Sequence, residues 1–187
     1  MKKLLIAATP LMTLFVTTLT HANDAALLAE ARKASMILPP KLLVALKEEM
    51  SKSGPEGAIP LCKDMAPQMA GEISQQTGWK IKRVSLKVRN DARAIPDAWE
   101  KAALEDFDKR TAAGEPPEKL EKGEKVGNEY RFVKALPVQP LCLSCHGSAE
   151  QISPAVKSVL GKHYPNDLAT GYSVGQIRGV ISVRKPL

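Results

Sequence analysis

Two cysteines and a histidine stand close together in the run Cys-Leu-Ser-Cys-His over residues 142–146. Two thiols separated by two residues can add across the two vinyl groups of a haem and form thioethers. A histidine directly after the second thiol is carried beneath the ring, where its imidazole can bind the iron. Gly147 follows and lets the backbone lie close to a porphyrin. The spacing therefore predicts one c-type haem attached through Cys142 and Cys145, with His146 as the proximal ligand.

Other chemistries use the same residue types. Cys142 and Cys145 can form a redox-active disulfide of the thioredoxin kind, but that motif connects a strand to a helix, and Pro140 suits such a setting poorly. The two thiols can also bind structural zinc if Cys62 and His163 complete a set of four ligands. The spacing can also be incidental. Export of the chain would favour the haem interpretation, because haem c is attached outside the cytoplasm.

The first 22 residues have the layout of a secretory signal peptide. Two lysines precede an uncharged, mostly apolar run over residues 4–20, and Thr20-His21-Ala22 places small residues where a signal peptidase reads them. The run is short for a membrane span, and Pro10 interrupts it. We expect cleavage after Ala22, which leaves residues 23–187 as a single periplasmic or otherwise exported domain with no transmembrane span.

The composition is that of a basic globular protein. The formal net charge is +7, but basic residues are scattered among acidic ones and aromatic residues make up only 4%. This pattern does not favour nucleic-acid binding, which uses clustered basic residues. A solvated surface, or one that meets acidic partners, accounts for the charge.

Cys62 is the third of three cysteines and stands alone in the sequence. Cysteines in an oxidising compartment are usually paired. A lone thiol there would risk oxidation or mispairing unless a ligand were bound to it. Iron ligation would occupy the thiol and deprotonate it. Cys62 lies on an apolar helical face, where it could meet a haem plane. The mature chain offers further candidates for the far side of the iron, although methionines at helical spacing are more often core residues: Met36, Met50, Met65, Met69 and His163.

The elements that must position these residues are helices and separated strands. We expect helices over 23–38, 42–50, 58–77, 97–113 and 153–161, with an interruption at Pro67. Strands are expected over 80–89, 128–135 and 177–184, and loops over 51–57, 115–127 and 164–175. Three separated strands among helices predict an α+β domain with an antiparallel sheet, preceded by a helical region over 23–57.

Several specific strings carry a resemblance that spans most of the mature chain. They are Cys62 with Ala66-Pro67, RVSLKVRN over 83–90, PDAWE over 96–100, CLSCHG over 142–147, YPNDLATGY over 164–172 and GQIRG over 175–179. The sequence resembles a family of small exported haem c domains with a PAS-like fold, known from cyanobacteria and proteobacteria. Asp91 departs from the family pattern, in which Pro is commoner after the Asn at this place.

The resemblance implies a PAS-like antiparallel sheet, normally of five strands, with flanking helices and a haem c pocket. It also implies that His146 and Cys62 are the axial pair. Beyond the resemblance, charge and aromatic character single out candidates for the pocket: three arginines that could pair with the propionates and two tyrosines that could line the walls, Arg83, Arg89, Arg178, Tyr164 and Tyr172.

The sequence favours a haem-based redox or gas sensor. Thiolate ligation donates strongly to ferric iron, so reduction would weaken the bond to Cys62 and open a site for a small diatomic gas. The chain carries no kinase, methyl-accepting or DNA-binding part, so a redox or signalling partner protein would receive the output. The alternatives are a small periplasmic electron carrier and a structural zinc-binding domain. A peroxidase-like enzyme needs an open iron site, which a sixth ligand opposes, so we expect no enzymatic activity.

Overall fold

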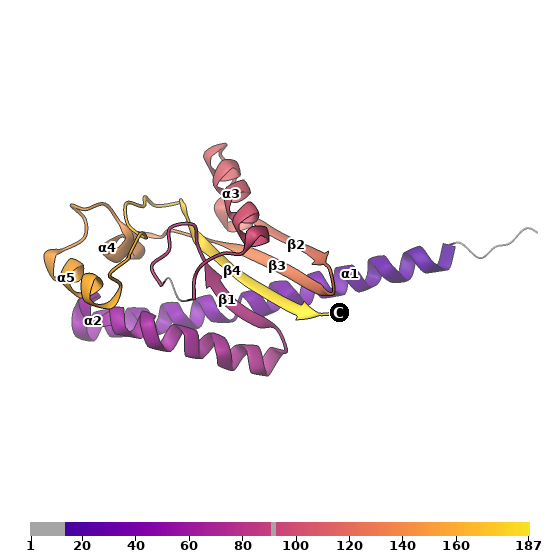
Figure 1. The fold of residues 1–187 in the computed structure, drawn as a ribbon, viewed down its shortest axis with the longest axis horizontal. Helices are drawn as coiled ribbons and strands as arrows, with labels where there is room; N and C mark the ends of the chain where they lie inside the picture. Colours follow the sequence, from indigo (N-terminus) through magenta and orange to yellow (C-terminus); the bar gives the residue numbers. More distant parts are fainter. Residues whose placement is uncertain (1–13, 91–92) are drawn as a thin grey trace, which may run out of the picture.

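A four-stranded antiparallel sheet organises the part of the chain that the computed structural model describes, residues 14–90 and 93–187 (Figure 1). The strands follow the order β1-β4-β3-β2. Their bounds are Lys80–Val84 for β1, Glu121–Val126 for β2, Glu129–Pro137 for β3 and Ile177–Pro186 for β4. Every neighbouring pair is antiparallel, which confirms the predicted α+β class with an antiparallel sheet.

Helices cover both faces of this sheet and one of its ends (Figure 1). The helices α1 (Leu14–Ser35) and α2 (Leu38–Thr77) lie along one face, and α3 (Ala98–Ala112) lies on the other. The short helices η2 (Pro140–Cys142) and α4 (Leu143–His146) lie with α5 (Pro154–His163) beyond the end of the sheet, and η1 (Pro117–Lys119) precedes β2. No helix in these described ranges is long and apolar enough to cross a bilayer.

Alternating side chains on β4 explain why the sheet carries helices on both faces. Ile181 and Val183 pack in the cluster that includes α1 and α2, whereas Val180 packs in the cluster that includes α3. Successive side chains of a strand point to opposite faces, so one apolar run supplies both cores. The strand expected over 177–184 is therefore confirmed and extends to Pro186.

The start of α3 ties that helix to the sheet. Asp97 accepts a hydrogen bond from the backbone N–H of Glu100 at 3.0 Å, and the Glu100 carboxylate accepts one from the backbone N–H of Asp97 at 2.9 Å. The same buried carboxylate pairs with Lys82 of β1 at 2.9 Å and accepts from the hydroxyl of Ser182 of β4 at 2.6 Å. Glu100 therefore both completes the capping box of α3 and connects this helix to β1 and β4.

The N-terminal helices differ from the expected ones. Helix α1 runs without a break from Leu14, so no cap forms at residues 23–24, and Pro39-Pro40 lie in the first turn of α2, where proline is tolerated. The non-helical residue within α2 is Gly54, at φ 71° and ψ 176°. It lies in the expected loop over 51–57, which is otherwise helical, and Pro67 does not interrupt the helix. Glycine adopts this conformation without the steric cost of a Cβ. Of the expected signal peptide, residues 1–13 lie outside the described residues.

The strand pattern also departs from expectation at two places. Residues 121–126 form β2 within a segment expected to be a loop, because a charged edge strand needs little apolar sequence. The strand expected over 80–89 ends at Val84. Beyond it the chain turns toward the 164–172 segment, where the Leu168 N–H donates to the Val88 carbonyl at 2.9 Å. The described residues therefore contain four strands, one fewer than the resemblance implies.

Candidate functional site

A cavity of about 750 Å³ lies between α2, the ends of β1 and β4, and the segment that holds the cysteine–histidine motif. Its volume falls within the range of about 300–1,000 Å³ that is usual for ligand and cofactor sites. Most of its wall is apolar, and α2 contributes more lining residues than any other element. The wall also carries the side chains expected to do chemistry: Cys62, Cys142, Cys145, His146, Arg83, Arg89, Arg178 and Tyr164.

The motif reaches this wall through a tight double turn. The backbone N–H of Cys142 donates to the Gln139 carbonyl at 2.9 Å, and the N–H of Gly147 closes α4 by donating to the Leu143 carbonyl at 2.9 Å. A Cβ at Gly147 would lie 2.6 Å from that carbonyl oxygen, so the turn requires glycine. Both motif thiols are free and half-buried, and burial raises the pKa of Cys145 to about 11. Cys145 is therefore a protonated thiol at neutral pH.

His146 is held through its Nδ1 atom, which donates to the carbonyl oxygen of Ala169 at 2.7 Å. Burial lowers the pKa of His146 well below its ordinary value, and the nearby positive charges of Arg178 and Arg89 act in the same direction. The imidazole is therefore neutral, with its proton on Nδ1. The lone pair of Nε2 is left for a metal, an arrangement common among metal-binding histidines.

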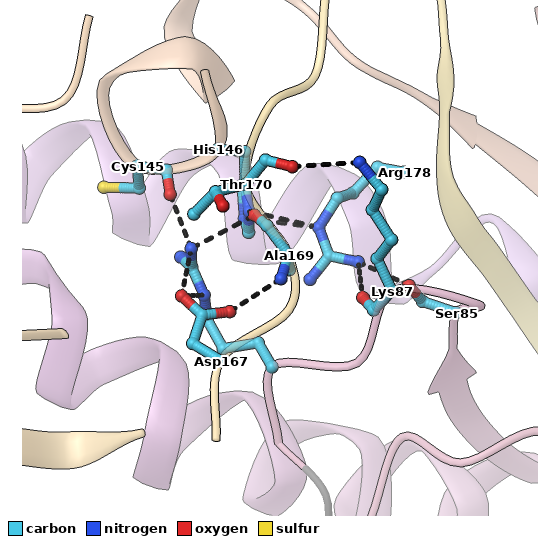
Figure 2. Close-up of polar contacts among 9 residues, drawn as sticks. Ser85, Lys87, Cys145, His146, Asp167, Ala169, Thr170 and Arg178 are labelled. Carbon is cyan, nitrogen blue, oxygen red and sulfur yellow. Dashed lines mark hydrogen bonds and ion pairs between the residues drawn. The ribbon is translucent and has the colours of Figure 1, made fainter. Parts of the chain in front are cut away.

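The 164–172 segment forms a clamp around the motif (Figure 2). Backbone N–H groups of this segment donate to the carbonyls of His146 and Gly147 at 2.9 and 2.7 Å. Asp167 accepts from the N–H of Ala169 at 2.8 Å and pairs with Arg89 at 2.9 Å. Arg89 donates in turn to the Cys145 carbonyl at 2.5 Å. These bonds fix the backbone on both sides of the histidine.

Cys62 faces the same cavity from α2. Burial raises the pKa of its thiol, while Arg83, Arg89 and Arg178 pull that pKa down. Among the alternative far-side ligands, Met36 and Met50 also line the cavity, whereas Met65, Met69 and His163 do not. Cys62 is thus the thiol that shares the cavity with the motif without belonging to it.

The candidate arginines differ in how they are engaged. Arg89 is committed to Asp167 and to two backbone carbonyls, those of Cys145 and Ala169. Arg83 is half-buried on the cavity wall, and no carboxylate of the described residues lies within ion-pair distance of it. Within the described residues, Arg83 therefore contributes a positive charge to the cavity wall without a carboxylate partner. Arg178 lies against His146, with Nε 3.3 Å from Nδ1.

The two candidate tyrosines take different places. Tyr164 lines the cavity, and burial raises its pKa to about 12. Tyr172 does not line it but packs edge-on against the ring of His146, with the ring centroids 6.3 Å apart. Sequence reasoning did not assign roles to Asp167 and Ala169. Their signal was the run YPNDLATGY, whose polar and backbone contacts to the motif only the fold reveals.

The zinc alternative has no ligand cluster to support it. Within residues 14–90 and 93–187, no group of three or more histidine, cysteine or acidic side chains is placed to hold a metal ion. His163, the fourth ligand that this alternative requires, lies outside the cavity wall that carries Cys62, Cys142 and Cys145. The arrangement instead suits a large planar group that contacts an apolar wall and reaches two thiols and one imidazole.

Comparison with known proteins agrees with this architecture. The sequence model of the Tll0287-like family matches residues 16–186. The chain belongs to the Tll0287-like family. A solved structure, the crystal structure of the cyanobacterial heme-protein Tll0287, is similar to this Tll0287-like chain with a TM-score of 0.55 and 28% sequence identity, over 65% of this chain and 70% of that one. Among curated proteins no match was found.

Proposed function

We propose that this chain is an exported c-type haem protein in which Cys142 and Cys145 bind the haem covalently and His146 and Cys62 are its axial ligands. The observation that carries the proposal is the shared cavity, which joins a free thiol of α2 to the motif. A similar solved structure is described as a heme-protein. Each motif thiol would add across one vinyl group, with sulfur bonding one carbon and hydrogen the other.

The charges and polarity of the cavity support this cofactor. A haem offers an apolar macrocycle with two propionates at one edge, and the α2 wall is largely apolar. Arg83 has no carboxylate partner within ion-pair distance in the described ranges, so a propionate would neutralise its charge. Arg89, already paired with Asp167, instead serves as part of the clamp around the motif.

A sensor role for the haem follows from the unequal support of the two ligands. His146 is held by Ala169 and by a segment bonded to the motif backbone on both sides. Cys62 is carried by α2 and follows the non-helical Gly54 of that helix by two turns. Cys62 would therefore be the ligand more readily displaced on reduction, and its displacement would open a position for a diatomic gas.

An electron carrier is the second candidate, and the clamp around His146 is what favours it. A rigid proximal ligand keeps structural change small when an electron is gained or lost. Voltammetry separates the two roles. Fast, reversible reduction with an unchanged visible spectrum supports a carrier. Hysteresis with a spectral change on reduction, and binding of carbon monoxide only to the reduced form, supports a sensor.

The experiment that tests haem ligation is expression with the haem c maturation proteins in a bacterial periplasm. Absorption and electron paramagnetic resonance spectra of the ferric protein are compared with those of Cys62→Ala and Met65→Ala. Met65 is exposed and does not line the cavity, so it is the matched control. A change of ligand field in Cys62→Ala alone supports the proposal. Unchanged spectra in Cys62→Ala would overturn the assignment of Cys62.

A further inference from the structure

Arg178 occupies an unusual place in the sheet. On β3 and β4, Leu136 pairs with Gly179 and Pro137 pairs with Ile177, with a register shift between them. Arg178 is the residue of β4 left without a partner at this irregularity. Such bulges turn a side chain away from its regular direction and often lie beside functional sites. Here the guanidinium is turned toward His146 (Figure 2).

The backbone next to Arg178 leaves little freedom for this arrangement to change. A Cβ at Gly179 would lie 2.4 Å from the carbonyl oxygen of Val84, so the close approach of β4 to β1 requires glycine. The guanidinium is also fixed at its far end, where NH1 donates to the Ser85 hydroxyl at 2.8 Å. That hydroxyl donates to the Lys87 carbonyl at 2.6 Å. Arg178 is therefore held from both ends.

The Nε–H group of Arg178 is directed at the imidazole of His146. Nε lies 3.3 Å from Nδ1 and 3.4 Å from Nε2, so the N–H is shared between the two ring nitrogens. Nδ1 already donates to Ala169. On its other side the guanidinium faces the ring of Tyr172, with Cζ 5.7 Å from the centroid.

The positive charge of Arg178 has no close counter-charge. No carboxylate of the described residues lies within ion-pair distance, and Asp167, the acid of this region, is paired with Arg89. Burial lowers the pKa of Arg178, with Arg83 acting in the same direction, although arginine stays protonated in proteins. Burying a charge without a counter-charge costs free energy of folding. The place of Arg178 beside the imidazole therefore points to a function for its charge.

We propose that the fixed positive charge of Arg178, beside the proximal imidazole, raises the reduction potential of the haem. The inference rests on the proposed function. Oxidation adds one positive charge to the iron, and a neighbouring positive charge disfavours that state in a poorly screened interior. Thiolate ligation acts in the opposite direction by stabilising ferric iron. Arg178 thus keeps the potential within reach of a donor despite the Cys62 ligand.

The test is spectroelectrochemical titration of the purified holoprotein and of Arg178→Gln, Arg178→Lys and Arg131→Gln. At a fixed applied potential near the midpoint, we expect Arg178→Gln to lower the ferrous-to-ferric ratio about tenfold, a shift of about 59 mV for one electron. Arg178→Lys keeps the charge and is expected to restore most of the ratio. Arg131 is a buried arginine on the α3 side, bonded to Asp97, and its loss should leave the ratio unchanged.

The outcomes separate the inference from the function on which it rests. A parent protein without covalent haem would refute the proposed function itself. Covalent haem with an unchanged ratio in Arg178→Gln would overturn the role of Arg178 alone, as would an equal shift in Arg178→Lys. If Arg178→Gln does not fold, the ferrous-to-ferric ratio is measured in Ser85→Ala instead. This variant removes the hydroxyl that holds the far end of the guanidinium. A lowered ratio supports the inference, and an unchanged ratio contradicts it.

Discussion

The Nδ1 atom of His146 lies 2.7 Å from the carbonyl oxygen of Ala169, a residue to which the sequence analysis assigned no role. This bond fixes both the tautomer of the imidazole and the direction of its Nε2 lone pair. Because the acceptor is a backbone atom, its position depends on whatever holds the 164–172 segment. Asp167 and Arg89 do so, and they reach the motif through the Cys145 carbonyl.

Breaking this clamp is expected to destabilise the protein and loosen His146, the proposed proximal ligand. Asp167→Asn removes the partner of Arg89, and both side chains are almost fully buried, so we expect a loss of about 3 kcal/mol in the free energy of unfolding. Asp106→Asn breaks an exposed ion pair with Arg110 and should cost less than about 1 kcal/mol. Urea unfolding of the two variants measures the difference. Equal losses would contradict the clamp.

Gly147→Ala is expected to lower the yield of haem attachment. The added Cβ would lie 2.6 Å from the Leu143 carbonyl, and the turn that presents Cys145 and His146 would have to shift. Gly161→Ala in α5 is the matched control, because its Cβ meets no atom within 4 Å, and alanine should stabilise that helix by up to about 1 kcal/mol. The measurement is haem per chain in the periplasmic protein. A full haem content in Gly147→Ala would refute this requirement.

The ionised carboxylate of Asp97 makes the free energy of unfolding depend on pH. Burial by itself would raise the pKa of this carboxyl, but hydrogen bonds from the Glu100 N–H and from Arg131 outweigh it, so the folded-state pKa is lowered. A group with a lowered folded-state pKa stabilises the fold above its unfolded pKa, and the stabilisation disappears as pH falls through the folded value. Asp97→Asn should therefore lose more stability at pH 7 than at pH 2 in urea titrations. An equal loss at both pH values would contradict this linkage.

The proposed ligation by Cys62 predicts that its removal opens the iron of the proposed haem. Cys62→Ala removes the thiol that shares the cavity with the motif, so ferric iron should take up cyanide or imidazole much faster than in the parent protein. Met65→Ala, at an exposed position on the same helix, should bind these ligands at the parental rate. Stopped-flow absorbance measures both. Identical rates in the parent and in Cys62→Ala would show that the thiol does not block the iron.

Much of the secondary structure could be predicted from local sequence patterns. The apolar runs of β3 and β4, the stop at Gly78 and the cap at Asp97 each depend on neighbouring residues, and each lies where the pattern indicates. Strand β2 was missed because Glu121–Val126 is charged and lies at the sheet edge. The break in α2 is at Gly54, within the segment 51–57 that the pattern predicts as a loop, whereas the interruption expected at Pro67 is wrong.

The candidate site likewise combines features that the sequence predicts with features that only the fold determines. The spacing of Cys142, Cys145 and His146 is local, so it could be read directly. The partners of Arg89 lie far along the chain, and the turn of Arg178 toward His146 depends on the irregularity between β3 and β4. Both arginines were expected to be candidates for the propionates. Their contacts instead support roles beside the motif, which leaves Arg83 for the propionates in the proposed function.

The central claim is that Cys142 and Cys145 hold one haem by covalent bonds. Mass spectrometry of the denatured protein, after periplasmic expression with the maturation proteins, tests it most directly. The account predicts a mass equal to that of the chain from residue 23 plus one haem, and loss of that haem from Cys142→Ala/Cys145→Ala. A denatured parent chain that carries no haem, or a double variant that keeps it, would contradict the account.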